Sequence, residues 1–302
     1  MRKDLVSIIL VNYNSTQYLI DAVKSIHKQC SDVDYEIIVV DNASPDNGSA
    51  LLRKTFGDKI TLVENTENVG FGGANNVGYK VSQGEYVFFL NPDTLLLNNA
   101  VSIFLDFMKM HKEDKIGGIG TILSDAQGQP INSYGDFITC DSVIKSYRKQ
   151  KHKEKPSFND EAFPVDFITG ADLFTTRSVL EEVGMFDTRF FMYCEEVDLQ
   201  KRMADAGYKR MIIPKARILH HDGGSYTKTR KRSARRRLEY GRSQIIYIKK
   251  HYGIKSSPPC KGGVRGGFFL FRLRFAFCRL PAVFNPCYSL KDNLSYLKML
   301  LF

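Results

Sequence analysis

A chain of 302 residues can form one large domain or a domain with an appendage, and its 43% hydrophobic and 25% charged residues are typical of a soluble globular protein. Six scattered cysteines with no C-x-x-C pair argue against a zinc knuckle or a disulfide framework and fit a reducing compartment. The net charge of +10 is uneven, because residues 208–302 carry a net +19 and residues 1–207 a net −9. This asymmetry predicts cation-assisted chemistry in the first part and binding of the second part to an anionic surface.

The first 125 residues alternate strand and helix patterns, which predicts βαβ units and a mostly parallel sheet. The predicted strands are residues 6–12, 36–41, 60–64 and 86–90. The predicted helices are residues 18–26, 49–55 and 73–82, and a fourth that Asn98 caps and that runs to about residue 110.

The fourth strand ends abruptly at Asn91-Pro92, because proline cannot donate to a strand ladder. Asp93 is therefore presented at the carboxyl edge, where open α/β sheets bind ligands. A carboxylate there suits Mg²⁺ or Mn²⁺ carrying a diphosphate. The alternative is a turn aspartate that caps the next helix.

The second half has a looser pattern. Residues 116–123 predict a strand and residues 126–130 a hairpin-like turn, whereas the polar residues 136–163 predict an insertion or acceptor-side loop. The later predicted elements are an ordered region at 165–176, helices at 177–183 and 195–206, strands at 210–213 and 216–219, a loop at 220–225, and a basic helix at 233–251. Gly207 suits the position just after a helix end.

Eight short motifs follow one another in order. They are SIILVNYN (7–14), VDNAS (40–44), NVGFGGANN (68–76), LNPD (90–93), GAD (170–172), GMFD (184–187), YCEEVDL (193–199) and HHDGGS (220–225). Each motif alone is weak, but the ordered set resembles the inverting glycosyltransferases of family 2, which have the GT-A fold. The closest branch is similar to the rhamnosyltransferase-type enzymes of bacterial surface polysaccharide synthesis, and the resemblance covers about residues 5–250.

The resemblance implies an α/β fold of the GT-A class: a mostly parallel central sheet flanked by helices, with a Rossmann-like nucleotide-binding half and a basic helical C-terminal appendage. The predicted domains are a catalytic domain (1–225), a basic helix packing on or extending it (226–255), and a linker with an amphipathic membrane-associating tail (256–302). The implied reaction transfers a sugar, with rhamnose among the candidates, from a dTDP- or UDP-sugar to a lipid-linked saccharide or polysaccharide.

Two rival functions remain open. A sugar nucleotidyltransferase shares an α/β nucleotide fold, but it would carry a Gly- and Arg-rich loop after the first strand, where this chain has Asn12-Tyr-Asn-Ser. A catalytically inactive nucleotide-sugar-binding module is the other alternative, and donor hydrolysis would separate it from an enzyme.

For the donor site, the resemblance implies that Asp41 accepts from N3–H of a uracil or thymine ring, with Asn12 and Asn14 beside the base. Asp93 would bind Mg²⁺ or Mn²⁺, and His220 would be a second metal ligand or a phosphate contact. His221 is expected to be structural. The remaining residues implied at the nucleotide are Asn68, Gly70, Gly72, Gly73 and Asn75, the glycines because they allow close backbone approach.

For the acceptor site, Glu195, Glu196 and Asp198 stand together where a helix is predicted to begin, and one carboxylate suffices as the base. The family's base is the second acid of a Glu-Asp pair, and Glu196 occupies that place. Asp198 is the reserve candidate. The alternative is that the acids stabilise the positive helix end.

The C-terminal segment is basic and rich in phenylalanine. Arg272, Arg274 and Arg279 interrupt its apolar run, which is too short to span a bilayer comfortably. With the basic residues at 228–237, it predicts a peripheral protein on the inner face of the cell membrane, within the cytoplasm. Packing on the catalytic domain is the alternative, and nucleic acid is not an expected partner because no recognised motif accompanies the basic patch.

Overall fold

The structure is a computed structural model that describes residues 1–139, 142, 161–221 and 230–253. Most of the predicted polar insertion and all of residues 256–302 lie outside the described residues, so the linker and the tail remain predictions. The contacts divide the chain into two compact units. The first comprises Met1–Phe137, Lys155–Phe191 and Glu195–Ser225, and the second comprises Ile138–Glu154, Met192–Cys194 and Tyr226–Phe302.

Within the described residues, the main sheet has eight strands in the order β3-β2-β1-β4-β10-β6-β11-β8. Its first half is parallel and consists of β1 (Arg2–Asn12), β2 (Tyr35–Asp41), β3 (Thr61–Glu64) and β4 (Gly84–Leu90). The mixed second half consists of β10 (Asp172–Thr176), which is antiparallel to β4, and of β6 (Ile116–Gly120), β11 (Lys209–Ile212) and β8 (Phe163–Val165).

In the described part of the chain, two antiparallel strand pairs lie outside the main sheet. Strand β12 (Ile218–His220) pairs with β5 (Thr94–Leu96), and β9 (Phe167–Ile168) pairs with β7 (Tyr134–Gly135). The β5–β12 pair ties the residues just after β4 to a segment more than a hundred residues later in the chain.

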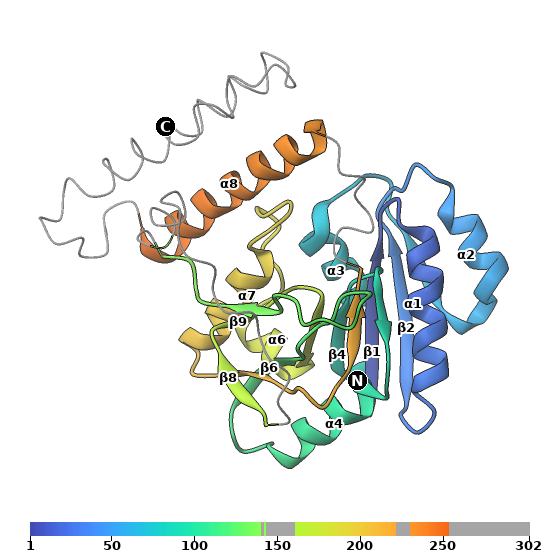
Figure 1. The fold of residues 1–302 in the computed structure, drawn as a ribbon, viewed down its shortest axis with the longest axis horizontal. Helices are drawn as coiled ribbons and strands as arrows, with labels where there is room; N and C mark the ends of the chain where they lie inside the picture. Colours follow the sequence, from blue (N-terminus) through green and yellow to red (C-terminus); the bar gives the residue numbers. More distant parts are fainter. Residues whose placement is uncertain (140–141, 143–160, 222–229, 254–302) are drawn as a thin grey trace, which may run out of the picture. The chain divides into compact units, whose positions relative to one another are not determined.

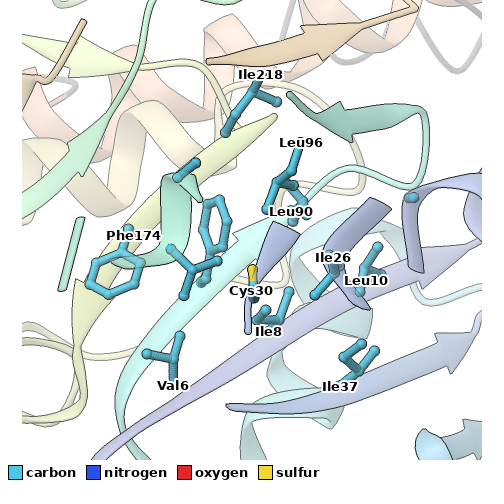
Figure 2. Packing of buried hydrophobic residues seen from close by; sticks show 14 of the residues in the cluster. Val6, Ile8, Leu10, Ile26, Cys30, Ile37, Leu90, Leu96, Phe174 and Ile218 are labelled. Atoms are coloured by element: carbon cyan, nitrogen blue, oxygen red, sulfur yellow. The ribbon is translucent and has the colours of Figure 1, made fainter. Parts of the chain in front are cut away.

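The apolar strands are buried on both faces, as their near-continuous hydrophobic runs predict. One face packs against α1 (Thr16–Gln29), α2 (Gly48–Phe56) and α4 (Ala100–Met110). The other face packs against α3 (Gly70–Val81), α6 (Arg177–Val183) and α7 (Glu195–Asp205). Figure 1 shows α1 and α2 beside the β1–β2 half of the sheet, and Figure 2 shows Ile8, Leu10, Leu90 and Leu96 within the first core.

The fold prediction is confirmed: the structure is a mixed α/β protein with a central sheet flanked by helices. The turn at 126–130 is also confirmed, since Asp125 N donates to Gln129 O at 2.8 Å. Gly207 has a φ of +85°, and Tyr208 N donates to Met203 O at 2.9 Å, which closes α7 as predicted. Helix α8 (Arg230–Tyr252) matches the predicted basic helix, and no helix among the described residues is long and apolar enough to cross a membrane.

One local prediction was wrong. Helix α4 is capped by Asn99, whose side chain accepts from Ser102 N, and not by Asn98. Asn98 instead bonds Lys215 O and Arg217 N at 2.9 Å each, so a distant segment decides between the two asparagines. The region at 165–176 is ordered as predicted and contains the short β9 and the longer β10.

Candidate active site at the carboxyl edge of the sheet

The first polar pair lies where β1 and β2 end. Asn12 and Asp41 are partners in the parallel register, and Asn12 Nδ2 donates to Asp41 Oδ1 at 2.9 Å. Asn12 is fully buried, and its Oδ1 accepts from Ser15 Oγ at 3.1 Å, so its side chain joins the start of α1 to Asp41. Asp41 is therefore oriented by Asn12, while Asn14 stands beside it on the exposed loop with its N–H donating to Ser44.

Asn42 organises the next loop, a role that the sequence reasoning missed. Its Nδ2 donates to Asn68 Oδ1 at 2.9 Å, and its Oδ1 accepts from Asn65 Nδ2 at 3.0 Å and from Val69 N at 3.1 Å. Asn68 Oδ1 also accepts from Gly70 N at 2.9 Å. Asn42 thus fixes the turn that leads into α3. The asparagines in VDNAS and NVGFGGANN were the sequence signal from which this role could have been predicted.

The glycines at the start of α3 have close protein neighbours. Gly70 has a φ of +79°, and a Cβ built there would lie 2.2 Å from the carbonyl oxygen of Phe191. A Cβ at Gly72 would lie 2.9 Å from Phe186 Cβ, and one at Gly73 would lie 3.1 Å from Val69 Cγ2. The buried Asn75 holds Phe71 O at 3.1 Å. Packing against residues 186–191 therefore explains why positions 70 and 72 require glycine. The predicted contact of these glycines with the nucleotide stays a prediction.

Asp93 and His220 face each other beside the end of β4. Asp93 Oδ1 lies 3.2 Å from His220 Nε2, and both side chains are largely buried. The register of the β5–β12 pair sets this geometry, since His220 lies opposite Thr94, and His221 N donates to Asp93 O at 2.9 Å. The structure thus brings together the two residues that the sequence assigned to a metal, while the His221 ring packs against Tyr18.

The three acids of α7 occupy different environments. Glu195 is 4% exposed, and its buried Oε2 has no hydrogen-bond partner. Burial and the neighbouring Glu196 carboxylate raise the pKa of Glu195 well above its usual range. Glu196 is half-buried, and its Cβ and Cγ lie near Gly170. Glu195 is the more deeply buried of the two residues, although Glu196 Oε2 is buried as well, so the two neighbouring carboxyl groups differ in environment.

Asp198 is engaged in structure. It is fully buried, and Arg202 Nε donates to its Oδ2 at 3.1 Å. The same guanidinium donates to Gly184 O at 2.7 Å and to Met185 O at 2.8 Å. Asp198 therefore orients the arginine that holds residues 183–185, which makes it a weaker candidate for the base than Glu196.

Asp172 is a further buried carboxyl group at this end of the sheet. It lies opposite Leu90 in the β4–β10 register, and its Oδ2 accepts from Thr121 N at 2.6 Å. Its Oδ1 is buried without a hydrogen-bond partner. Burial raises the pKa of Asp172 well above its usual range, which outweighs the lowering by the Thr121 hydrogen bond.

This pKa shift predicts a stability that falls as pH rises. The folded chain holds the Asp172 proton more tightly than the unfolded chain, so stability is lost above the carboxyl's ordinary pKa of 3.8, at up to about 1.4 kcal/mol per pH unit. Asp172→Asn removes this titration, so its melting temperature relative to wild type should increase from pH 5 to pH 8. A difference that stays constant with pH would contradict a protonated Asp172.

Comparisons with known proteins identify the family of the chain. The family model described as glycosyl transferase family 2 matches residues 7–184. An N-acetylglucosaminyl-diphospho-decaprenol L-rhamnosyltransferase of Mycobacterium tuberculosis is 23% identical over 293 residues, covering 88% of this chain and 91% of its own. The rhamnosyltransferase WbbL of Escherichia coli is 26% identical over 242 residues, covering 74% of this chain and 86% of its own.

The solved structures show the same fold. A mannosyltransferase of Pyrobaculum calidifontis, in complex with GDP-mannose and Mn²⁺, aligns with a TM-score of 0.57 at 17% identity, covering 98% of this chain and 85% of its own. The family match spans more than half of the sequence and includes the strand ends that carry Asn12, Asp41 and Asp93. The chain therefore belongs to glycosyl transferase family 2 and is a glycosyltransferase.

Proposed function

We propose that this enzyme is an inverting transferase that moves a sugar, with rhamnose as the first candidate, from a dTDP- or UDP-sugar to a lipid-linked saccharide or polysaccharide. The observation that carries the proposal is the convergence of Asp41 and the Asp93–His220 pair at the carboxyl edge of the parallel half-sheet. This is the edge where open α/β sheets bind nucleotides.

Asp41 is suited to a pyrimidine that carries an N3–H donor. Its carboxylate accepts one hydrogen bond from Asn12 and lies at the sheet edge with 6% exposure. A carboxylate accepts only, so it favours uracil or thymine over cytosine, whose N3 is itself an acceptor. Asp41→Asn should therefore weaken UDP or dTDP binding by about 1–3 kcal/mol, measured by titration calorimetry. Unchanged affinity for both nucleotides would remove Asp41 from the base site.

The Asp93–His220 pair fits a divalent cation. Adjacent ligands of one octahedral ion with bonds of 2.0–2.1 Å lie about 3 Å apart, close to the 3.2 Å between Asp93 Oδ1 and His220 Nε2. The described residues contain no group of three or more His, Cys, Asp or Glu side chains that could hold a metal ion, so diphosphate oxygens and water would complete the coordination. An imidazole ligand favours Mn²⁺ over Mg²⁺. A bound cation would offset the charge of the leaving nucleoside diphosphate.

Glu196 is the proposed base. Inversion needs a base on the side of the sugar ring opposite the leaving group, and one carboxylate suffices. Glu195 is almost fully buried and Asp198 is paired with Arg202, whereas Glu196 is half-buried and occupies the place of the family's base, with its Oε2 buried. Glu196 removes the proton of the acceptor hydroxyl as that oxygen attacks the anomeric carbon.

The relatives support the acceptor class. The name of the Mycobacterium tuberculosis relative specifies an N-acetylglucosaminyl-diphospho-decaprenol acceptor. A further relative in Staphylococcus aureus is a poly(ribitol-phosphate) β-N-acetylglucosaminyltransferase, 27% identical over 199 residues. Both names describe transfer of a sugar to a lipid-linked or polymeric glycan. We therefore place the acceptor of this enzyme in the same class.

The function is tested with purified enzyme, Mn²⁺ and dTDP-rhamnose or UDP-sugars, with a short-chain N-acetylglucosaminyl-diphospho-lipid as acceptor. Mass spectrometry of the lipid should show one added sugar, with release of the nucleoside diphosphate. Formation of pyrophosphate from a nucleoside triphosphate and a sugar 1-phosphate would instead show a nucleotidyltransferase. Donor binding without transfer or hydrolysis would indicate an inactive binding module.

A peripheral membrane position follows from the basic C-terminal part of the sequence. Residues 208–302 carry a net +19, and each basic residue near an anionic surface contributes up to about 1 kcal/mol. The full chain should sediment with vesicles containing phosphatidylserine, and binding should weaken with salt. A chain that ends at residue 255 lacks the Phe-rich segment but keeps most of this charge, so it should bind the vesicles more weakly and still bind the donor. Absence of vesicle binding at low salt would contradict the proposal.

A further inference from the structure

A hydrogen-bond relay of four side chains runs from the loop before α2 to the carboxylate proposed at the nucleotide base. Thr16 Oγ1 donates to Asp46 Oδ2 at 2.8 Å and accepts from Asn12 Nδ2 at 3.1 Å. The same Asn12 nitrogen donates to Asp41 Oδ1 at 2.9 Å. Thr16 is the first residue of α1 and is only 6% exposed, whereas Asp46 is exposed. The relay therefore links a surface acid to Asp41, and all four residues belong to the first compact unit.

The direction of the hydrogen bonds at Thr16 is determined by Asp46. Desolvation raises the pKa of the Asp46 carboxyl, but the hydrogen bonds that it accepts, led by the one from Thr16, lower that pKa below its usual range. An ionised carboxylate can only accept, so the Thr16 hydroxyl donates its single hydrogen to Asp46 and turns a lone pair toward Asn12. Thr16 thus selects the nitrogen, and not the oxygen, of the Asn12 amide as its neighbour.

The Asn12 amide is held on every side. Its Oδ1 accepts from Ser15 Oγ at 3.1 Å and from Ser15 N at 3.3 Å, while its Nδ2 donates to Thr16 and Asp41. These four bonds fill all the hydrogen-bonding positions of an amide. Asn12 therefore holds Asp41 by Oδ1. The other oxygen, Asp41 Oδ2, accepts from Ser44 N at 3.4 Å and keeps capacity for a further donor.

The first residue of α2 gives the relay the space that it needs. A Cβ built on Gly48 would lie 1.9 Å from Thr16 Oγ1 and 3.0 Å from Asp46 Oδ1. Gly48 N also donates to Asp46 Oδ1 at 3.1 Å. Glycine is a poor helix former, so helix formation alone does not favour it at this position. Its presence lets the beginnings of α1 and α2 approach closely enough for Thr16 to reach Asp46.

We propose that Thr16 is a positioning residue for recognition of the nucleotide base and that it acts through Asn12 on Asp41. The inference rests on the proposed function, in which Asp41 accepts from N3–H of uracil or thymine. Such a hydrogen bond weakens steeply when its angle departs from the preferred one, so the carboxylate must be held in one orientation. Thr16 and its partner Asp46 hold it there and thereby contribute to the preference for uracil over cytosine.

The affinities of the full chain for UDP and CDP, measured by calorimetry with Mn²⁺, test the proposal without turnover. Both nucleotides carry the same diphosphate, so the ratio of their dissociation constants reports on the base. Thr16→Val keeps the shape of the side chain and removes the hydroxyl. It should weaken UDP binding roughly five- to tenfold, the effect of losing one hydrogen bond, and leave the weaker CDP binding unchanged. Thr16→Ser should restore the preference, whereas a wild-type ratio in Thr16→Val would overturn the proposal.

Thr175→Val is the matched control for lost stability. Thr175 is a buried threonine of β10, away from the strand ends, and its Oγ1 donates to Gly117 O at 2.6 Å. Its replacement should lower the melting temperature and leave both nucleotide affinities unchanged. If Thr16→Val also lowers only the melting temperature, its hydroxyl stabilises the fold alone and the proposal is wrong.

Asp46→Ala tests the other end of the relay. Asp46 is exposed, so this variant decides the question even if Thr16→Val folds poorly. It should lower the preference for UDP in the same direction but by a smaller factor, because Thr16 keeps its hydrogen bond from Asn12. A wild-type preference in Asp46→Ala would overturn the proposed relay.

Asp41→Asn is measured in parallel to separate the relay from the base contact on which it rests. If Asp41→Asn keeps the wild-type preference for UDP, or if the wild type has none, the proposed contact of Asp41 with the base is wrong and the relay is refuted with it. If Asp41→Asn loses the preference while Thr16→Val keeps it, only the role of Thr16 is refuted.

Discussion

Replacing Glu196 with glutamine is expected to lower turnover by roughly 10²–10⁴-fold while leaving donor affinity nearly unchanged. Glutamine keeps the size of the side chain but cannot accept the proton of the acceptor hydroxyl at neutral pH. Turnover is measured as dTDP or UDP release in the presence of acceptor, and affinity by calorimetry. Glu196→Asp keeps a carboxylate on a shorter side chain and should retain part of the activity.

The controls for Glu196 use other acids of the chain. Glu113→Gln changes an exposed acid beyond α4 and should leave turnover unaltered. Asp198→Asn should lower the melting temperature, because it weakens the bond that orients Arg202 and thereby residues 183–185. Normal turnover in Glu196→Gln, together with a folded but inactive Asp198→Asn, would transfer the base assignment to Asp198.

Asp93→Ala is expected to reduce turnover by at least about 10²-fold, because cation-assisted departure of a diphosphate is worth several kcal/mol. EDTA should inactivate the wild-type enzyme, and Mn²⁺ should restore it more effectively than Mg²⁺. A second measurement is independent of turnover: Mn²⁺ with UDP should raise the melting temperature of wild type but not of Asp93→Ala, because ligands that bind only the folded state stabilise it.

The control for Asp93 is Asp58→Ala, which removes an exposed carboxylate near the end of α2. It should behave like wild type in both measurements. His220→Ala should reduce the rise in melting temperature with Mn²⁺ less than Asp93→Ala does, because His220→Ala keeps Asp93, the only charged ligand of the pair. Full wild-type activity in excess EDTA would exclude a metal role for Asp93 while leaving the transferase assignment intact.

Much of the fold could be predicted because the parallel half-sheet repeats one local pattern. Each buried strand is a continuous apolar run, and each ends at polar residues such as Asn12, Asp41 and Asn91. The choice between Asn98 and Asn99 as the cap of α4 could not be predicted, since both have the same local chemistry and Arg217 decides between them. Short strands such as β9 carry too few residues to show a period.

The position of a site residue could be predicted where that residue directly follows the end of a strand. Asp93 and His220 came from the ordered motifs, and the structure places them together. The burial of Asp172 could not be predicted, because it depends on β4, β10 and β6 lying side by side. The pairing of Asp198 with Arg202 did leave a signal, since an acid and a base four residues apart face each other on a helix.

The β5–β12 pair makes the number of residues between Ile218 and His220 matter as much as their identity. Ile218 lies opposite Leu96 and is buried in the core, as Figure 2 shows, and His220 lies two residues later on the same face of the strand. The anchoring of Ile218 therefore aims the imidazole at Asp93. Inserting one residue between Ile218 and His220 would turn that ring to the opposite face, whereas deleting one would bring His221 opposite Thr94 in its place. The doubled histidine thus gives this strand tolerance to shortening but none to lengthening.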